Sequence, residues 1–322
     1  MTKKTGIKKF LSDNLVIIGI VILVIVTAII EPKFLGKANI TNIMRQLWPL
    51  PFTALGMTFV VIAGFVDLSI PGIMALDAVL VATLLPVVGQ VWAIIIGILL
   101  GGLMGYINGT VLTGVGARIS AENLFICYGM AQVYTAIGLI ITQAKTIRIQ
   151  RLGVPVTIFD ALGSGTIFGV VPIVLVVFIV ILLIMHFFQR KTLVGRSISA
   201  LGGNREAAYL AGFNVNRTVR IVYMISGLFA AMGAISSVAR TTIANTGCGS
   251  GYETDSILCV VVGGTSLKGG KGSVLRTMIG VVLVTLLSNC MNMIGLSTYM
   301  QTVMRGAVLV VAIWLDNRKA AL

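Results

Sequence analysis

The chain alternates long apolar runs with short polar segments. Ten runs stand out, at 15–30, 47–65, 70–87, 91–112, 123–142, 172–188, 218–238, 255–267, 274–290 and 301–315. A helix needs about 20 apolar residues to cross a bilayer, and most runs approach that length. The pattern predicts an all-α polytopic membrane protein with about ten transmembrane helices, including one short or re-entrant helix at 255–267. Residues 1–322 then form a single transmembrane domain.

The start of the chain is predicted to be a retained span rather than a cleaved leader. Lysines precede the first apolar run, as in a signal peptide, but Glu31-Pro32 follows it instead of a small-x-small cleavage site. We therefore expect residues 1–14 to be a cytoplasmic N-terminus.

Composition and charge support this class of protein. Hydrophobic residues make up 57% of the chain and charged residues only 11%, whereas soluble domains carry roughly 25% charged residues. The net charge of +14 lies mainly in loops beside the apolar runs, which is the positive-inside pattern rather than a nucleic-acid footprint. It predicts that the loop 190–217 and the tail 316–322 are cytoplasmic and that the loop 143–171 faces outward.

The loop 190–217 is predicted to hold one short helix. Asn204 is a favourable N-cap, Glu206 suits the first turn, and Gly212 is a typical residue just beyond a helix end. Ala207, Ala208 and Ala211 would form a face of small residues that another surface could approach. Two interpretations stay open at this point, a solvated connector and a docking helix for a cytoplasmic partner.

A glycine-rich stretch follows the eighth apolar run. Its candidate residues are Gly263, Gly264, Thr265, Ser266, Gly269, Gly270 and Gly272. The spacing does not match a phosphate-binding loop, because Gly270 falls where that motif requires lysine when counted from Gly264. We expect a short or re-entrant segment that lies inside protein.

Two short patterns recur about 200 residues apart. Val60-Val-Ile-Ala-Gly64 leads to Gly72, and Val260-Val-Val-Gly-Gly264 leads to Gly272. Duplicated halves are common in membrane transporters, so the pattern suggests an internal repeat.

Several polar residues lie in or beside the apolar runs. Asp67 and Ser69 are candidate caps for the helix that begins near Pro71, and Asp77 lies within a span, where an acid is costly. The candidates for a translocation path are Asp67, Asp77, Asn108, Asn123, Gln132, Asn289, Asn292 and Gln301. Each could instead hydrogen-bond helices together. So many amides without charge pairs favour a neutral polar solute over an ion.

The sequence contains no group of residues spaced as in a catalytic or metal-binding site. The four cysteines have no CxxC spacing, and the single histidine, His186, has no neighbours at ligand or nucleophile spacing. We expect no enzyme activity, no metal site and no cofactor bound by this chain.

The C-terminal half closely resembles a known transporter family. Ala200-Leu-Gly-Gly-Asn-Arg-Glu-Ala-Ala208, Gly212-Phe-Asn-Val-Asn-Arg217, Gly251-Tyr-Glu-Thr-Asp255 and Gly263–Ser273 are similar to motifs of the ribose/xylose/arabinose-type ABC transporter permeases. So is the turn at Asp67-Leu-Ser69.

The resemblance implies a permease that works as a pair in the bacterial cytoplasmic membrane and imports a monosaccharide by alternating access. ATP and Mg would bind separate ATP-binding subunits, and an extracytoplasmic sugar-binding protein would dock on the outward loops 143–171 and 239–254. The ATPase-coupling loop would include Gly203, Asn204, Arg205, Glu206, Ala207, Ala208, Gly212, Asn214 and Asn216. The identity of the sugar, and whether the two permeases are the same chain, stay open.

The alternative hypothesis is an ion-coupled secondary carrier of a small polar solute, with Asp67 or Asp77 as the ion site. A second alternative is a membrane assembly that transports nothing. ATP-independent uptake that collapses with the membrane potential would favour the carrier.

Overall fold

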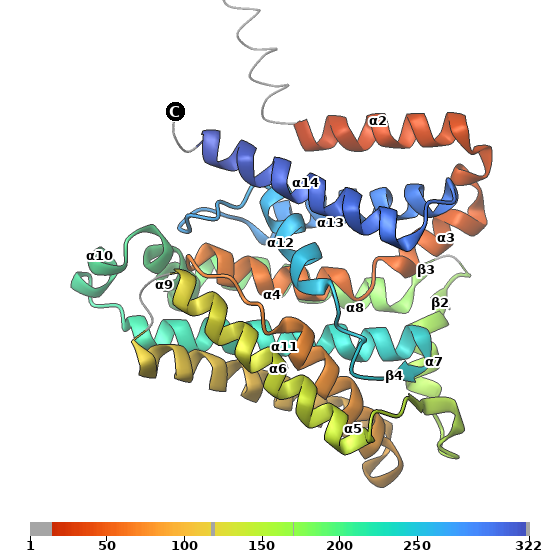
Figure 1. Ribbon diagram of the computed structural model, residues 1–322, viewed down its shortest axis with the longest axis horizontal. Coiled ribbons are helices and arrows are strands. Elements are labelled where there is room, and N and C mark those ends of the chain that lie inside the picture. Colours follow the sequence, from red (N-terminus) through yellow and green to blue (C-terminus); the bar gives the residue numbers. More distant parts are fainter. Residues whose placement is uncertain (1–14, 117–119, 170, 320–322) are drawn as a thin grey trace, which may run out of the picture.

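The computed structural model describes residues 15–116, 120–169 and 171–319. The described part is mostly helical, and its helices form one bundle (Figure 1). The expected cytoplasmic N-terminus, 1–14, and the last three residues of the expected tail lie outside the described residues.

The first helices run from the periphery of the bundle to its centre. Helix α2 (Leu15–Ile30) leads through a 3-10 turn (Pro32–Leu35) to α3 (Lys37–Gln46) and α4 (Leu50–Ile62). Helix α2 is largely exposed, whereas every residue of α4 is buried. A helix that is apolar all round suits a fully enclosed position, and the sequence of α4 is of this kind.

Helix α5 (Ile70–Val115) is a hairpin of two helical arms. Its backbone leaves the helical conformation at Gly89 (φ 78°, ψ 170°), a combination that only glycine adopts easily. The arms then lie side by side, since a methyl group added to Gly97 would come within 3.2 Å of Asp77 Oδ1. The break falls between the predicted spans 70–87 and 91–112. Helix α6 (Ser120–Thr142) packs against this hairpin.

The predicted outward loop 143–171 contains short elements of its own. Strand β1 (Ile147–Arg148), a 3-10 turn (Ile149–Arg151), helix α7 (Thr157–Ser164) and strand β2 (Thr166–Ile167) precede β3 (Val171–Pro172). Strand β1 pairs antiparallel with β4 (Ile243–Ala244), which joins the two predicted outward loops, and β2 pairs with β3. Both pairs and α7 lie at one end of the bundle (Figure 1).

The remaining helices complete the bundle and carry the predicted coupling loop. In order they are α8 (Ile173–Lys191), α9 (Leu193–Gly203), α10 (Arg205–Leu210), α11 (Val215–Thr241), α12 (Tyr252–Val262), α13 (Val274–Met293) and α14 (Thr298–Lys319). Helix α10 protrudes at the end opposite the strand pairs (Figure 1).

The core forms where α11 packs on the second arm of α5. Glycines allow the two backbones to touch: a methyl group on Gly105 would overlap the Tyr223 carbonyl oxygen, and one on Gly227 would overlap that of Gly101. Close contact through small residues is a common way for helices to associate where lipid provides no hydrophobic drive.

Five described helices are long and apolar enough to cross a membrane, namely Ile70–Val115, Ala121–Thr142, Ile173–Lys191, Val215–Thr241 and Val274–Met293. Shorter apolar helices are Ile18–Ile30, Leu50–Ile62 and Thr298–Trp314. The prediction of a mainly helical, polytopic membrane protein is therefore confirmed. The total of ten spans and the orientation of the termini stay predictions.

The two recurring sequence patterns have the same local structure. Helix α4 ends with Gly64 at φ +85°, and α12 ends with Gly264 at φ +86°. In each, the N–H of the next residue donates to a carbonyl five residues back, Phe65 to Val60 and Thr265 to Val260. This is the Schellman-type helix end, which requires a left-handed residue. The same helix end also follows α10, at Gly212, and α13, at Gly295, so the internal repeat stays a prediction.

Candidate functional site

The predicted short helix is present as α10, with both ends as expected. The Asn204 side chain accepts a hydrogen bond from the Ala207 N–H at 3.0 Å, and Gly212 takes a left-handed conformation (φ +84°) just beyond the helix. Asn214 caps the next helix, α11, by accepting from the Arg217 N–H at 2.9 Å. Two asparagine caps therefore fix the geometry of the predicted coupling loop.

Replacing Asn204 with alanine tests the first cap. Loss of an N-cap side chain costs a helix typically about 1 kcal/mol, and α10 is only six residues long. We expect the Asn204→Ala variant to fold, because the cap is exposed, but to show faster proteolysis within 204–212. Asn216→Ala, an exposed residue of the same loop that caps no helix, is the control. Equal rates of proteolysis in both variants would contradict the assignment of Asn204 as the N-cap of α10.

The most exposed apolar side chains of α10 are large ones, not the small alanines. Tyr209 and Leu210 are 71% and 84% exposed, whereas Ala208 is 3% exposed and packs inward. The prediction of a docking face built from Ala207, Ala208 and Ala211 is therefore wrong for Ala208, which attaches the helix to the body. The physical reason is that the inward side of a short helix on a protein surface also needs a small apolar residue.

Three backbone segments meet beneath α10, and we call them the glycine junction: the turn 62–65, the end of α9 at 201–204 and the glycine-rich segment 263–272. The Gly270 N–H donates to the Ile62 carbonyl oxygen at 2.8 Å. A methyl group on Gly202 would overlap that oxygen and lie 2.6 Å from the Gly270 nitrogen. Glycine is needed because backbone lies against backbone.

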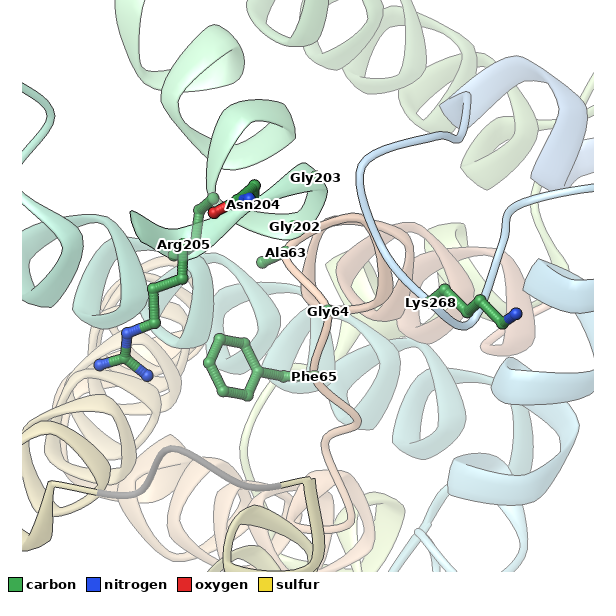
Figure 2. A pocket seen from close by; sticks show the side chains of 9 residues that line it. Ala63, Gly64, Phe65, Gly202, Gly203, Asn204, Arg205 and Lys268 are labelled. Carbon is green, nitrogen blue, oxygen red and sulfur yellow. The ribbon is translucent and has the colours of Figure 1, made fainter. Parts of the chain in front are cut away.

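A shallow hollow of about 220 Å³ opens at the glycine junction (Figure 2). It is lined by Ala63, Gly64, Phe65, Leu201, Gly202, Gly203, Asn204, Arg205 and Lys268. The side chains of Arg205 and Phe65 lie on the same side of the hollow, and Lys268 points away from them. The predicted coupling loop and the predicted glycine-rich segment therefore share one surface.

The glycine-rich segment itself is not helical. Helix α12 is short, as predicted, but ends at Val262, and 263–273 form a turn-rich connection to α13. Its far end is held by Gln189 of α8, which donates to the Gly272 carbonyl at 3.0 Å and accepts from the Val274 N–H at 3.1 Å.

A buried polar network starts at Asp67, in the non-helical segment before α5. Asp67 accepts from the Ser69 N–H at 2.8 Å, the Ser69 hydroxyl at 2.5 Å and the Ser226 hydroxyl of α11 at 2.6 Å. Asn108 donates to Ser69 Oγ at 2.7 Å and accepts from Tyr134 of α6 at 2.7 Å. The network thus connects α5, α6 and α11. The prediction that Asp67 or Ser69 caps α5 is wrong, because neither side chain accepts from a first-turn amide of that helix.

Asn123 belongs to the same region. Its amide donates to the Val66 carbonyl at 2.7 Å, and the Tyr223 hydroxyl donates to Asn123 Oδ1. Non-helical backbone inside a membrane protein must be satisfied by neighbouring protein groups, and Asn123 provides this for the segment before α5.

The other path candidates do not join the network around Asp67. Asn289 of α13 exchanges two hydrogen bonds with Asn39 of α3, each 3.1 Å, and Gln301 donates to Asn292 at 2.8 Å. Asp77 is fully buried between the arms of α5, and among the described residues neither of its carboxylate oxygens has a hydrogen-bond partner. Hydrogen bonds of this kind join one helix to another. Among the path candidates, only Gln132 lines one of the two cavities described for this structure.

That cavity has a volume of about 520 Å³ and lies between the start of α5, the middle of α6 and the start of α12. Its lining residues are Leu68, Pro71, Gly72, Tyr128, Ala131, Gln132, Thr135, Thr246, Gly247, Ser250, Glu253 and Thr254.

Some partners were not predicted from the sequence. Tyr134, Tyr223 and Ser226 complete the network around Asp67, and Arg305 of α14 forms a salt bridge of 2.7 Å with Asp255 of α12. An arginine inside an apolar run indicates a buried partner of opposite charge, so the salt bridge could have been suspected from the sequence. A tyrosine or a serine in a helix gives no comparable indication of its hydrogen-bond partner.

Comparison with known proteins agrees with this architecture. Residues 39–313 match the family model described as branched-chain amino acid transport system / permease component. The ribose import permease protein of Haemophilus influenzae is 32% identical over 98% of this chain and 96% of its own length. That of Bacillus subtilis is 35% identical over 94% and 92%. The D-allose transport system permease protein of Escherichia coli is 31% identical over 92% and 90%. No solved structure gave a significant match.

The fold, the long apolar helices and these relatives define a membrane permease. The chain belongs to the monosaccharide ABC transporter permease family and is a multi-pass protein of the bacterial inner membrane.

Proposed function

We propose that this chain is the transmembrane permease subunit of an ATP-driven, binding-protein-dependent importer of a monosaccharide or similar small polyol. The observation that supports it best is α10, a capped helix that protrudes from the bundle with Tyr209 and Leu210 exposed, 71% and 84%. Large exposed apolar side chains on a polar loop are typical of a protein-binding surface. The partner in this proposal is the ATP-binding subunit.

The chain's own part in the mechanism is to transmit motion. Movement of α10 would pass to the end of α9 and, through Gly202 and Gly270, to the turns that end α4 and α12. The turn after α4 leads directly to Asp67, whose hydrogen bonds reach α5 and α11. Packed elements of this kind switch between discrete arrangements, which suits alternating access.

ATP and Mg would bind the partner subunit, and this chain would bind no cofactor. Phosphoryl transfer needs a phosphate-binding loop and a magnesium-binding acid, and the stretch Gly264–Lys271 does not have the required spacing. The proposal includes two permease copies or paralogues, ten spans and both termini in the cytoplasm, following the distribution of Lys and Arg.

The opposite end of the bundle would receive the sugar-binding protein. The pairing of β1 with β4 holds the loops 143–171 and 239–254 together, and the tip of the β2–β3 hairpin carries Phe168, which is 98% exposed. A partly apolar surface formed by both loops fits a protein partner.

A charge on the exposed face of α10 tests the proposal. We expect Leu210→Asp to lower co-purification of the ATP-binding subunit and ATP-dependent uptake at least tenfold, because it places a carboxylate in an apolar contact. Tyr299→Asp is the control, since Tyr299 is 87% exposed and belongs to α14, outside the predicted coupling loop. Co-purification can be quantified by mass spectrometry and uptake with labelled D-ribose. If Leu210→Asp bound the ATPase as the unmodified chain does, α10 would not be the docking helix.

A further inference from the structure

The cavity between α5, α6 and α12 lies where two helices begin inside the bundle. Pro71 in the first turn of α5 contacts the segment before α12, because a methyl group on Gly249 would lie 2.5 Å from the Pro71 carbonyl oxygen. The residues that α6 contributes, from Tyr128 to Thr135, fall at the middle of its range Ser120–Thr142. The cavity therefore lies beside the middle of α6 and not at an end of that helix.

The polar groups of the cavity are suited to hydroxyl groups. Gln132, Thr246 and Ser250 offer an amide and two hydroxyls, and Glu253 offers a carboxylate. Glu253 is half-buried and lines the cavity, so its carboxylate offers a charged acceptor for the O–H groups of a ligand.

The cavity also has an apolar wall and lacks positive charge. Tyr128 is 57% exposed and lines the cavity, and an aromatic ring can pack against the C–H face of a sugar ring. No Lys or Arg is among its lining residues, while Glu253 contributes a negative charge. This combination favours a neutral polyol and disfavours a sugar phosphate or sugar acid.

The exposure of polar residues on this face argues against contact with lipid. Gln132 and Ser250 are exposed although they lie beside the middle of α6. Unpaired amides and hydroxyls are unfavourable in hydrocarbon, so this face borders water or a second protein surface.

We propose that this cavity is a binding site for a neutral monosaccharide-sized polyol within one permease chain, with Glu253 accepting hydrogen bonds from its hydroxyl groups and Tyr128 packing on its ring. The inference rests on the proposed import function and narrows its substrate to uncharged polyols. The volume of about 520 Å³ lies in the range of small-molecule sites.

Cysteine protection tests the site on the full chain in lipid nanodiscs, without any partner. Ser250→Cys, made together with Cys248→Ser, is reacted with a methanethiosulfonate reagent in the presence of D-ribose, D-allose or D-ribose 5-phosphate. We expect the neutral sugars to slow labelling and the phosphate to leave it unchanged. Adding Glu253→Gln should weaken the protection roughly tenfold, the loss typical of a hydrogen bond to a charged group. Equal protection by the phosphate, or none by either neutral sugar, would overturn the proposal.

Uptake separates failure of this inference from failure of the proposed function. If the unmodified chain with its ATPase and binding protein imports no neutral sugar, the proposed function fails. If it imports sugar and Glu253→Gln imports at the same rate, only the site fails. We expect Glu253→Gln to import roughly tenfold more slowly with its ATPase still stimulated by the loaded binding protein. Glu31→Gln, far from the cavity in the turn before α3, is the control.

A second variant covers the case in which Glu253→Gln does not fold. Thr246→Val keeps the side-chain shape and removes one hydroxyl from the cavity, whereas Thr302→Val does the same on the exposed face of α14. Slower uptake by Thr246→Val alone supports the site, and equal uptake by both variants counts against it.

Discussion

Adding one methyl group at Gly202 is expected to abolish transport. The methyl group of Gly202→Ala would overlap the Ile62 carbonyl oxygen and lie 2.6 Å from the Gly270 nitrogen, which together form a hydrogen bond of the glycine junction. Backbone atoms cannot move aside as flexible side chains do, and overpacking of this kind typically costs about 1–3 kcal/mol or more. We expect ATP-dependent uptake by Gly202→Ala to fall below a tenth of the normal rate.

The neighbouring glycine provides a control of the same size. A methyl group on Gly203 would meet nothing within 4 Å, and alanine is the better helix former, by about 1 kcal/mol in a helix interior. Gly203→Ala should therefore transport normally and melt at an unchanged or higher temperature. Equal activity of the two variants would show that the glycine junction neither holds the three segments together nor transmits motion between them.

Removing the Asp67 carboxylate is expected to have the largest effect on stability. In Asp67→Ala, one backbone N–H and the hydroxyls of Ser69 and Ser226 lose their acceptor inside the bundle. Each buried donor left unpaired costs about 1–3 kcal/mol. The hydroxyls can find other acceptors by rotation, so we expect a total loss of about 3 kcal/mol, measured as unfolding free energy or as a lower melting temperature in detergent.

Asp77 provides the matched comparison, because it is the same residue type at the same burial. Neither of its oxygens has a hydrogen-bond partner among the described residues. Asp77→Ala removes a poorly solvated acid as well as packing volume, and these two effects oppose each other. We expect a change of less than about 1 kcal/mol. If both variants lost stability equally, burial alone rather than the Asp67 hydrogen bonds would set the cost.

Local signals in the sequence predicted the helices well. The apolar runs coincide with the long apolar helices, the break at Gly89 lies in the gap between two runs, and Asn204 with Gly212 marks both ends of α10. These features depend on a few neighbouring residues, so one sequence is enough to recognise them. The unusual amount of glycine near 202 and 263–272 was also visible.

Contacts between distant segments could not be predicted in the same way. Nothing near Gly202 indicates that the Ile62 carbonyl lies against it, and nothing near Asp67 identifies Ser226 as its partner. The direction of Ala208 depends on how α10 sits on the bundle. The same holds for the cavity beside Glu253, which exists only because the starts of α5 and α12 meet inside the bundle.

The most direct test of the account is uptake by proteoliposomes that contain this chain, its co-purifying ATP-binding subunit and a sugar-binding protein. Labelled D-ribose and D-allose would be offered with ATP, with a non-hydrolysable ATP analogue, and with an imposed membrane potential alone. An ATP-driven importer will accumulate a neutral sugar only with hydrolysable ATP, and accumulation will be lost in Leu210→Asp and retained in Tyr299→Asp. Accumulation driven by the membrane potential without ATP would contradict the proposed function and identify an ion-coupled carrier.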